Sequence, residues 1–236
     1  TVYDRTAYEE SPLIAERIGD ADVIVINKTP ISKETMDKCP NLKAIAVLAT
    51  GYNVVDYEYA KSKGIQVFNA PGLNANAVAE LTISKMLDIS RGTFTANYDV
   101  KVKHEWDKYK FEGRELRGKT LGIMGFGRIG QRVGELGRAF KMNIVAYDPF
   151  LPDEVFKQQE ATKASIDELI KVSDFISIHV PLTPETKDLF NKKSIAEMKD
   201  GAVVLNMSRG GIVNEADMYE ALKEGRIGGY AADVME

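Results

Sequence analysis

The chain has little of several things that would define other classes of protein. Cys39 is the only cysteine among 236 residues, which excludes an internal disulfide framework and a metal cluster built from cysteines. The net charge of -4 leaves no basic footprint, so nucleic acid and anionic membranes are not expected as partners. No apolar run approaches the length of a membrane span. Together these absences favour a cytoplasmic protein without a bound metal.

A glycine-rich stretch after an apolar run is the most informative feature of the sequence. Residues 121–124 predict a buried strand, and Gly125, Gly127 and Gly130 follow it with the spacing G-x-G-x-x-G. In such a loop one glycine permits the tight turn, one lets the backbone approach a pyrophosphate, and one lets the next helix pack closely on the strand. The start of that helix offers unpaired N–H groups to phosphates. The stretch therefore predicts a dinucleotide-binding turn.

An acidic residue follows the next predicted strand. Residues 144–147 lead into Asp148, about 20 residues beyond the glycine loop, where an acid accepts hydrogen bonds from an adenosine ribose. Pro149 and Phe150 come next rather than arginine or lysine, so a 2′-phosphate would meet a carboxylate. NAD is therefore favoured over NADP. The alternative is that Asp148 only opens a turn before Pro149.

Strand-like runs alternate with helical patterns along the chain, which is typical of βαβ units and parallel sheets. Strands are predicted at residues 2–3, 23–26, 44–49, 65–68, 121–124, 144–147, 174–179, 202–206 and 229–233. Helices are predicted at residues 8–18, 32–38, 56–64, 77–90, 129–140 and 214–223, and after capping boxes at 165–168 and 194–197. The β-branched run at 23–26 is expected to be buried. Residues 93–118 predict a helix and an irregular crossing.

The pattern predicts two α/β units joined by a helix. We place the first unit at residues 1–91 and the second at residues 92–236. In open α/β sheets, ligands lie beyond the carboxyl ends of the strands, so the residues just after each strand are the candidates for chemistry.

Arg209 is the sharpest of these candidates. It follows the predicted strand at 202–206 on a loop that contains Gly210 and Gly211. A guanidinium at this position suits bidentate binding of a substrate carboxylate and polarisation of the neighbouring carbonyl. An interdomain salt bridge is the alternative interpretation, and spacing alone does not separate the two.

Other polar residues at strand ends have weaker claims. His179 could act as an acid or base, but a packed, hydrogen-bonded histidine is the more common case at such a position. His104 lies in a polar stretch and is expected at the surface. Asp233 could bind a nicotinamide carboxamide or cap a turn. Tyr52 and Asn53 offer polar groups near a substrate, where their backbone N–H groups could matter more than their side chains.

Several ordered motifs resemble the D-isomer-specific 2-hydroxyacid dehydrogenase family, and the resemblance covers essentially the whole chain. The motifs are NAPG at residues 69–72, VAE at 78–80, GKTLGIMGFGRIG at 118–130, HVPLT at 179–183, NMSRGG at 206–211 and ADV at 232–234. The resemblance implies an α/β protein with a flavodoxin-like substrate domain, here incomplete, and a Rossmann domain with a doubly wound parallel sheet. It also implies hydride transfer between NAD and C2 of a D-2-hydroxy acid or 2-oxo acid.

The same resemblance assigns roles to individual residues. Arg209 matches the catalytic arginine that holds the substrate carboxylate and carbonyl, while Gly51 and Tyr52 match the backbone cradle for that carboxylate. The matched cofactor-binding positions are Thr50, Gly125, Gly127, Arg128, Ile129, Gly130, Asp148, Val180, Met207, Ser208 and Asp233. Among them, Arg128 and Ile129 match pyrophosphate contacts.

The chain departs from the family pattern at both ends. In the family, a catalytic glutamate follows the aspartate matched by Asp233 at a position beyond Glu236, and a catalytic histidine comes later still. The N-terminus resembles the family from its second strand onward. We therefore expect a family member trimmed at both ends, without this acid–base pair.

One loop bears on the substrate. Residues 48–56 are most similar to glycerate dehydrogenases, also called hydroxypyruvate reductases. We expect an NAD-dependent enzyme of glycerate, hydroxypyruvate or glyoxylate, and a homodimer, since the family usually pairs through the cofactor domain. D-lactate and D-3-phosphoglycerate dehydrogenases remain alternatives. A dinucleotide-sensing interaction protein and a catalytically incomplete fragment are alternatives of other classes.

Overall fold

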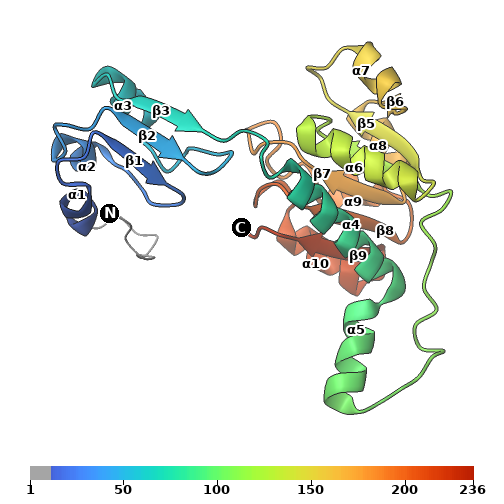
Figure 1. Ribbon diagram of the computed structural model, residues 1–236. Helices are drawn as coiled ribbons and strands as arrows, with labels where there is room; N and C mark the ends of the chain where they lie inside the picture. The colour runs from blue at the N-terminus through green and yellow to red at the C-terminus, as the bar shows by residue number, and fades with distance from the viewer. Residues whose placement is uncertain (1–11) are drawn as a thin grey trace. The chain divides into compact units, whose positions relative to one another are not determined.

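The computed structural model describes residues 12–236, so the short strand predicted at residues 2–3 and the first part of the helix predicted at 8–18 lie outside the described residues. The chain divides into two compact units, residues 1–74 and 75–236. Each unit is an α/β structure built on a parallel sheet, as predicted (Figure 1). No helix within residues 12–236 is both long enough and apolar enough to cross a membrane.

The first unit contains a three-stranded sheet in the order β1-β2-β3. Its elements are α1 (Pro12–Ile18), β1 (Val23–Ile26), α2 (Lys33–Asp37), β2 (Ala44–Val47), α3 (Tyr57–Ser62) and β3 (Gln66–Asn69). Two helices begin where the sequence predicts. The Ser32 hydroxyl accepts a hydrogen bond from the Thr35 N–H, and the Asp56 carboxylate accepts one from the Tyr59 N–H. These caps satisfy N–H groups that a first helical turn leaves unpaired.

Strand β1 is not buried, contrary to the prediction for its apolar run. Val23 and Val25 are 57% and 62% exposed, whereas Ile24 and Ile26 pack against the core of the unit. Successive side chains of a strand point to opposite faces of its sheet. A parallel strand is buried only when both faces are covered, and the described core of this unit lies on the face of Ile24 and its partner Ile45.

The second unit contains a six-stranded parallel sheet in the order β6-β5-β4-β7-β8-β9. Its elements are α4 (Ala75–Arg91), α5 (Thr93–Tyr98), the π-helix η1 (Asp99–Lys103), β4 (Thr120–Met124), α6 (Arg128–Ala139), β5 (Asn143–Tyr147), α7 (Asp153–Gln158), β6 (Thr162–Lys163), α8 (Ile166–Val172), β7 (Phe175–Ile178), α9 (Lys192–Ala196), β8 (Ala202–Asn206), α10 (Glu215–Lys223) and β9 (Ile227–Ala232). Counted within this unit, the order is the 3-2-1-4-5-6 of doubly wound dinucleotide-binding sheets. It reverses between β4 and β7, where such sheets bind their ligands.

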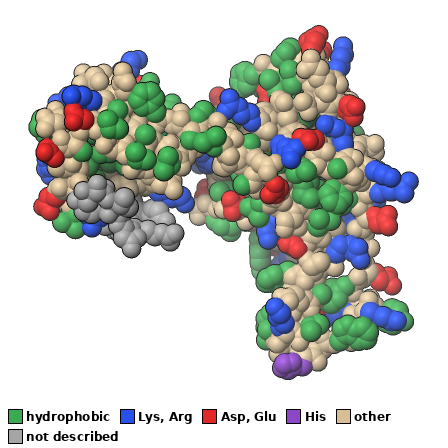
Figure 2. All heavy atoms as spheres, in the orientation of Figure 1, with side chains coloured by type: hydrophobic (Ala, Val, Ile, Leu, Met, Phe, Trp, Pro, Cys, Tyr) green, Lys and Arg blue, Asp and Glu red, His purple; other side chains and the backbone are tan. Residues whose placement is uncertain are grey.

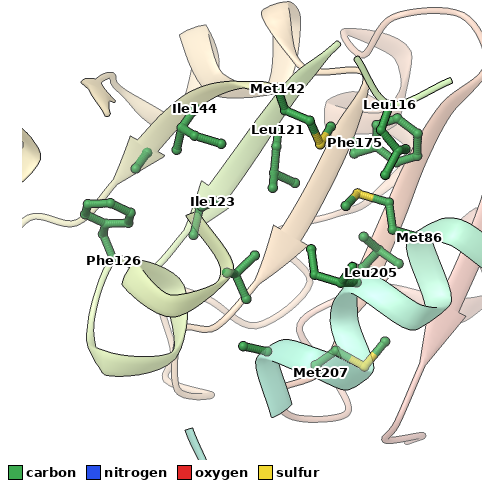
Figure 3. Close-up of a cluster of buried hydrophobic side chains, with 14 of the residues drawn as sticks. Met86, Leu116, Leu121, Ile123, Phe126, Met142, Ile144, Phe175, Leu205 and Met207 are labelled. Atoms are coloured by element: carbon green, nitrogen blue, oxygen red, sulfur yellow. The ribbon is translucent and has the colours of Figure 1, made fainter. Parts of the chain in front are cut away.

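Helix α4 packs on the sheet of the second unit. Its Ile83 and Met86 are buried in one cluster with Leu121 of β4 and Leu205 of β8 (Figure 3). The structural division therefore falls after Asn74, whereas the predicted division lies after residue 91. The physical reason is the apolar stripe of α4, which leaves water by packing against this sheet.

Helix α6 lies unusually close to the sheet because of its glycines. A side-chain carbon at Gly137 would lie 2.9 Å from Leu121 Cδ2 and 3.0 Å from Ile144 Cδ1. The predicted apolar face also forms, with Val133 buried completely in the same cluster. Each glycine costs helix stability about 1 kcal/mol relative to alanine, and in return α6 comes close to β4 and β5.

One local prediction differs from the structure, and two short elements were not predicted. The capping box predicted at 194–197 forms one turn earlier, with Asn191 as the N-cap of α9 and the Ser194 hydroxyl accepting from the Asn191 N–H. Asn191 takes this position because its side chain accepts from two backbone N–H groups of the first turn. The box predicted at 165–168 forms as expected. The short elements α7 and β6 were not predicted, because neither carries a periodic apolar pattern long enough to identify it.

Candidate active site

Gly125 follows β4 and lies close to the backbone at the end of β7, where the strand order reverses. Its φ of 90° lies in the region that favours glycine, and a side-chain carbon there would lie 2.8 Å from the carbonyl carbon of His179. Gly130, in the first turn of α6, is equally constrained, because a side-chain carbon would run into the Gly125 carbonyl oxygen. The two glycines therefore allow the turn, the helix and the end of β7 to come together.

Gly127 has the opposite surroundings. Nothing lies within 4 Å of the place where its side-chain carbon would be. It is the N-cap of α6, no side chain caps this helix, and the first turn holds no acidic residue. Uncapped N–H groups at a helix start bind anions, and the exposed Arg128 adds a positive charge beside Ile129. This open turn fits the pyrophosphate of a dinucleotide.

The Asp148 carboxylate lies against the same turn. Its Oδ2 accepts a hydrogen bond from the Phe126 N–H at 3.0 Å, and its Oδ1 accepts one from the Phe150 N–H at 3.0 Å. The second bond is the turn contact considered from the sequence, while the first ties the acid to the glycine loop. Both oxygens keep acceptor capacity for further donors, such as ribose hydroxyls.

Ser208 connects the loops that follow β7 and β8. Its hydroxyl donates a hydrogen bond to the carbonyl oxygen of Val180. Val180 is 8% exposed and packs in the core on one face of the sheet, while Met207 is 7% exposed and packs on the other. Each of the two loops is therefore anchored in one core, and the Ser208 hydroxyl ties them to each other.

The Arg209 side chain is exposed at the end of this loop. Its Nη1 donates a hydrogen bond to the Ser208 carbonyl oxygen at 2.8 Å. Within residues 75–236, no carboxylate lies within ion-pair distance of this guanidinium. Most of its five N–H donors are therefore available, and such a planar group binds a carboxylate bidentately. Asp233 follows β9, is exposed, and its N–H donates to the Asn206 carbonyl at 3.1 Å.

Three candidates belong to the first unit, on the loop after β2. Thr50 Oγ1 donates to Asn74 Oδ1 at 3.0 Å, and the Thr50 carbonyl accepts from Asn69 Nδ2 at 2.7 Å. These bonds tie the loop to the end of β3 and to the segment that follows it. Tyr52 is 41% exposed, and Gly51 lies between it and the anchored threonine.

His179 is packed and hydrogen-bonded, as the sequence analysis favoured. Its Nε2 lies 2.6 Å from the Ser177 hydroxyl, and its buried Nδ1 has no partner among the described residues. Burial lowers the pKa of His179 to about 3, so the ring is neutral at pH 7 and does not suit the role of proton donor. His104, expected at the surface, is exposed at the end of η1.

Two residues at this edge of the sheet had no role assigned from the sequence. Ser177 supports the His179 ring, and Asn206 binds the loop that carries Arg209. Both are polar side chains that are buried at or near the ends of strands. A polar residue inside an apolar run is the signal that could have found them, because buried polar groups are hydrogen-bonded.

Known proteins resemble the chain in sequence and in structure. Residues 83–236 match the family model described as D-isomer specific 2-hydroxyacid dehydrogenase, NAD binding domain. A hydroxypyruvate reductase of Blautia hydrogenotrophica is 40% identical, over 99% of this chain and 74% of that protein. A D-3-phosphoglycerate dehydrogenase of Methanocaldococcus jannaschii is 44% identical, over 94% of this chain and 43% of that protein. The crystal structure of a D-lactate dehydrogenase from Aquifex aeolicus, complexed with NAD and lactic acid, matches with a TM-score of 0.80 and 34% identity, over 94% of this chain and 67% of that one.

The strand order and the glycine turn define the class of the second unit, which is a Rossmann-type domain that binds NAD. The chain belongs to the D-isomer specific 2-hydroxyacid dehydrogenase family, as its motifs predicted. Its class of activity is that of an NAD-dependent oxidoreductase of D-2-hydroxy acids. The chain spans about three quarters of the matched reductase and less than half of the matched phosphoglycerate dehydrogenase.

Proposed function

We propose that the protein transfers a hydride between NAD and C2 of a small acid of the glycerate, hydroxypyruvate or glyoxylate type. The exposed guanidinium of Arg209 carries the proposal, because it has no carboxylate partner in its own unit and lies on a loop bound to the end of β7. Similarity to a hydroxypyruvate reductase supports the substrate class. D-lactate and D-3-phosphoglycerate remain the alternative substrates, since dehydrogenases of both are also similar.

In this proposal, the second unit holds NAD at two points. The first turn of α6, with Arg128 and Ile129, binds the pyrophosphate, and Asp148 accepts hydrogen bonds from the adenosine ribose. NAD supplies or accepts the hydride when it is bound. The remaining proposed contacts to the cofactor come from Thr50, Gly125, Gly127, Gly130, Val180, Met207, Ser208 and Asp233.

Arg209 is the proposed anchor of the substrate. Two parallel N–H bonds of its guanidinium would hold the carboxylate, and a further N–H would polarise the C2 carbonyl. Gly51 and Tyr52, on the loop after β2, are proposed to bind substrate through their backbone N–H groups. Such binding would fix the orientation of C2, which selection of a single hydroxyacid isomer requires.

The substrate is tested by following NADH oxidation by the full-length protein with hydroxypyruvate, glyoxylate, pyruvate and 3-phosphohydroxypyruvate. We expect the highest kcat/KM with hydroxypyruvate or glyoxylate. A clear preference for pyruvate or for the phosphorylated acid would favour the alternative dehydrogenases. Tight NADH binding without turnover of any 2-oxo acid would favour a dinucleotide sensor instead.

The proposed partner is a second copy of the chain. Six large apolar side chains between residues 94 and 109 are about half exposed or more: Phe94, Tyr98, Val100, Val102, Trp106 and Tyr109. Helix α5 extends away from the sheet of the second unit (Figure 1), and apolar side chains are visible on this part of the surface (Figure 2). Monomers rarely expose patches of this kind, and two-fold dimers are the commonest oligomers.

Light scattering measures the oligomeric state. We expect a dimer for the full-length protein and a monomer for the double variant Phe94→Asp, Trp106→Asp. Tyr219→Asp is the control, because Tyr219 is 61% exposed but lies on α10. A monomeric wild-type protein would contradict the proposal.

The proposed location is the cytoplasm. The one cysteine, Cys39, is a buried free thiol, and this usage is typical of reducing compartments. Fractionation of cells that express the full-length protein tests the location, and recovery outside the cytoplasmic fraction would contradict it.

A further inference from the structure

Asn206 ends the strand that leads to Arg209. It is 1% exposed, and its register partners are Ile178 of β7 and Ala232 of β9. Its carbonyl accepts a hydrogen bond from the Asp233 N–H at 3.1 Å. The backbone of Asn206 is therefore fixed from both neighbouring strands, whereas Arg209 lies on a loop beyond the sheet.

The Asn206 side chain turns back onto that loop. Its Oδ1 accepts a hydrogen bond from the Ser208 N–H at 3.2 Å, and its Nδ2 donates one to the Arg209 carbonyl oxygen at 2.9 Å. One amide thus binds the peptide group before Ser208 and the peptide group after Arg209. The loop is held at two points by a side chain whose own backbone is paired with both neighbouring strands.

The peptide group between these two points faces the guanidinium. Its carbonyl, that of Ser208, accepts the hydrogen bond from Arg209 Nη1 at 2.8 Å. The Ser208 hydroxyl binds the Val180 carbonyl, so the loop is also tied to the strand end beside the glycine turn. The direction of the guanidinium therefore depends on the peptide group between Ser208 and Arg209. Asn206 holds the peptide groups directly before and after it.

We propose that Asn206 is a positioning residue, which acts by holding the Arg209 guanidinium in the geometry that binds the 2-oxo acid. This inference rests on the proposed function of Arg209. Bidentate binding needs both N–H groups aligned with the carboxylate, and a shift of about 1 Å at a reacting centre costs about 100-fold in rate. Alanine offers neither bond, and aspartate offers the acceptor without the donor.

A double-mutant cycle on the full-length protein tests the proposal, with Asn206→Ala, Arg209→Ala and the combined variant. We expect Asn206→Ala to lower kcat/KM for hydroxypyruvate about 10-fold to 100-fold while the Kd for NADH stays unchanged. In the Arg209→Ala background, the same substitution is expected to have no further effect on kcat/KM. Asn206→Asp is expected to fall between wild type and Asn206→Ala.

Asn191→Ala is the matched control for loss of stability alone. Asn191 also uses both ends of its amide, since Nδ2 donates to the Asp188 carbonyl at 2.7 Å and Oδ1 accepts from the N–H groups of Lys193 and Ser194 at 3.0 and 3.3 Å. It holds the start of α9 rather than the Arg209 loop. We expect Asn191→Ala to lower the Tm and leave kcat/KM unchanged.

The outcomes separate this inference from the proposed function. If Arg209→Ala retains full kcat/KM, the role of Arg209 is wrong and the role of Asn206 falls with it. If Arg209→Ala is inactive but Asn206→Ala keeps wild-type kcat/KM, or multiplies the loss in the combined variant, only the positioning role is overturned. If Asn206→Ala does not fold, Asn206→Asp decides, because wild-type kcat/KM in that variant would also overturn the role.

Discussion

Strands β1 and β8 are both short and apolar, yet their surroundings differ. Every second side chain of β1 is exposed, whereas β8 is buried along its whole length. β8 lies between β7 and β9 and has an apolar core on each face, while β1 is an edge strand with its described core on one face. An apolar run therefore predicts a strand, but its neighbours decide how many of its faces are covered.

The sheet with two covered faces is also the one that carries the glycine turn and Arg209. Its loops begin at strands that are packed against a core on both faces. Such strands form a rigid scaffold, which positions the side chains of a site. The loop with Thr50 in the first unit is held instead by exposed hydrogen bonds. We therefore expect substitutions in the second sheet to have larger effects than matched ones in the first.

The largest difference is expected at the ends of β8 and β2. Arg209→Lys keeps the charge but removes the planar fork, and should lower kcat/KM for the 2-oxo acid about 1000-fold with NADH affinity unchanged. Thr50→Ala removes one neutral hydrogen bond and should lower kcat/KM about fivefold. Steady-state kinetics and NADH titration measure both. The control is Arg117→Lys, at an exposed arginine of the second unit. This substitution should change neither kcat/KM nor NADH affinity.

The next difference is expected between Gly130 and Gly64. Gly130→Ala drives a side-chain carbon into the Gly125 carbonyl and should destabilise the protein by about 3 kcal/mol and abolish NADH binding. Gly64 has a φ of 75° but open space around it, so Gly64→Ala should cost about 1 kcal/mol. Urea unfolding followed by fluorescence gives both values. Equal destabilisation by the two substitutions would contradict the close packing assigned to α6.

A direct comparison of the two sheets uses one substitution in each. Val204→Ala in β8 should lower the free energy of unfolding by about 2 kcal/mol, because Val204 is completely buried. Val25→Ala in β1 should change it by less than about 0.5 kcal/mol, since that side chain is 62% exposed. A large effect at Val25 would show that a further part of the protein covers this face of β1.

The smallest effect concerns pH and belongs to the second unit alone. Burial lowers the pKa of His179 to about 3, so the unfolded chain binds this proton more readily than the folded protein. The free energy of unfolding is therefore highest above the unfolded pKa of about 6.5. It decreases as pH falls, by about 1.4 kcal/mol between pH 8 and 5.5. Unfolding of wild type and His179→Gln at these two pH values isolates the effect. A wild-type loss no greater than that of His179→Gln would contradict it.

Local chemistry was predicted well from the sequence. Ser32, Asp56 and Asn214 cap helices because the residue type and the start of a helical pattern are close neighbours in the chain. The glycine spacing and Asp148 likewise predicted a dinucleotide turn, and the family match supports NAD as the cofactor. The capping box at 194–197 failed because Asn191, three residues earlier, competes for the same turn.

Contacts across the sheet were not predictable in this way. Nothing in the sequence shows that Ser208 binds the Val180 carbonyl, or that Asn206 holds the Arg209 loop, because these bonds depend on which strands are neighbours. The place of α4 is a similar case. Its apolar stripe predicts a helix that packs on something, but not that its partner is the second sheet.

The sequence by itself determined most strands and helix starts, the dinucleotide turn and the family, because each depends on residues a few positions apart. Only the tertiary structure decided that β1 stays exposed on one face, that His179 is buried and neutral, and that Asn206 binds the loop of Arg209. Burial and long-range hydrogen bonds depend on which surfaces meet. That choice is made by the packing of the whole sheet rather than by any one segment.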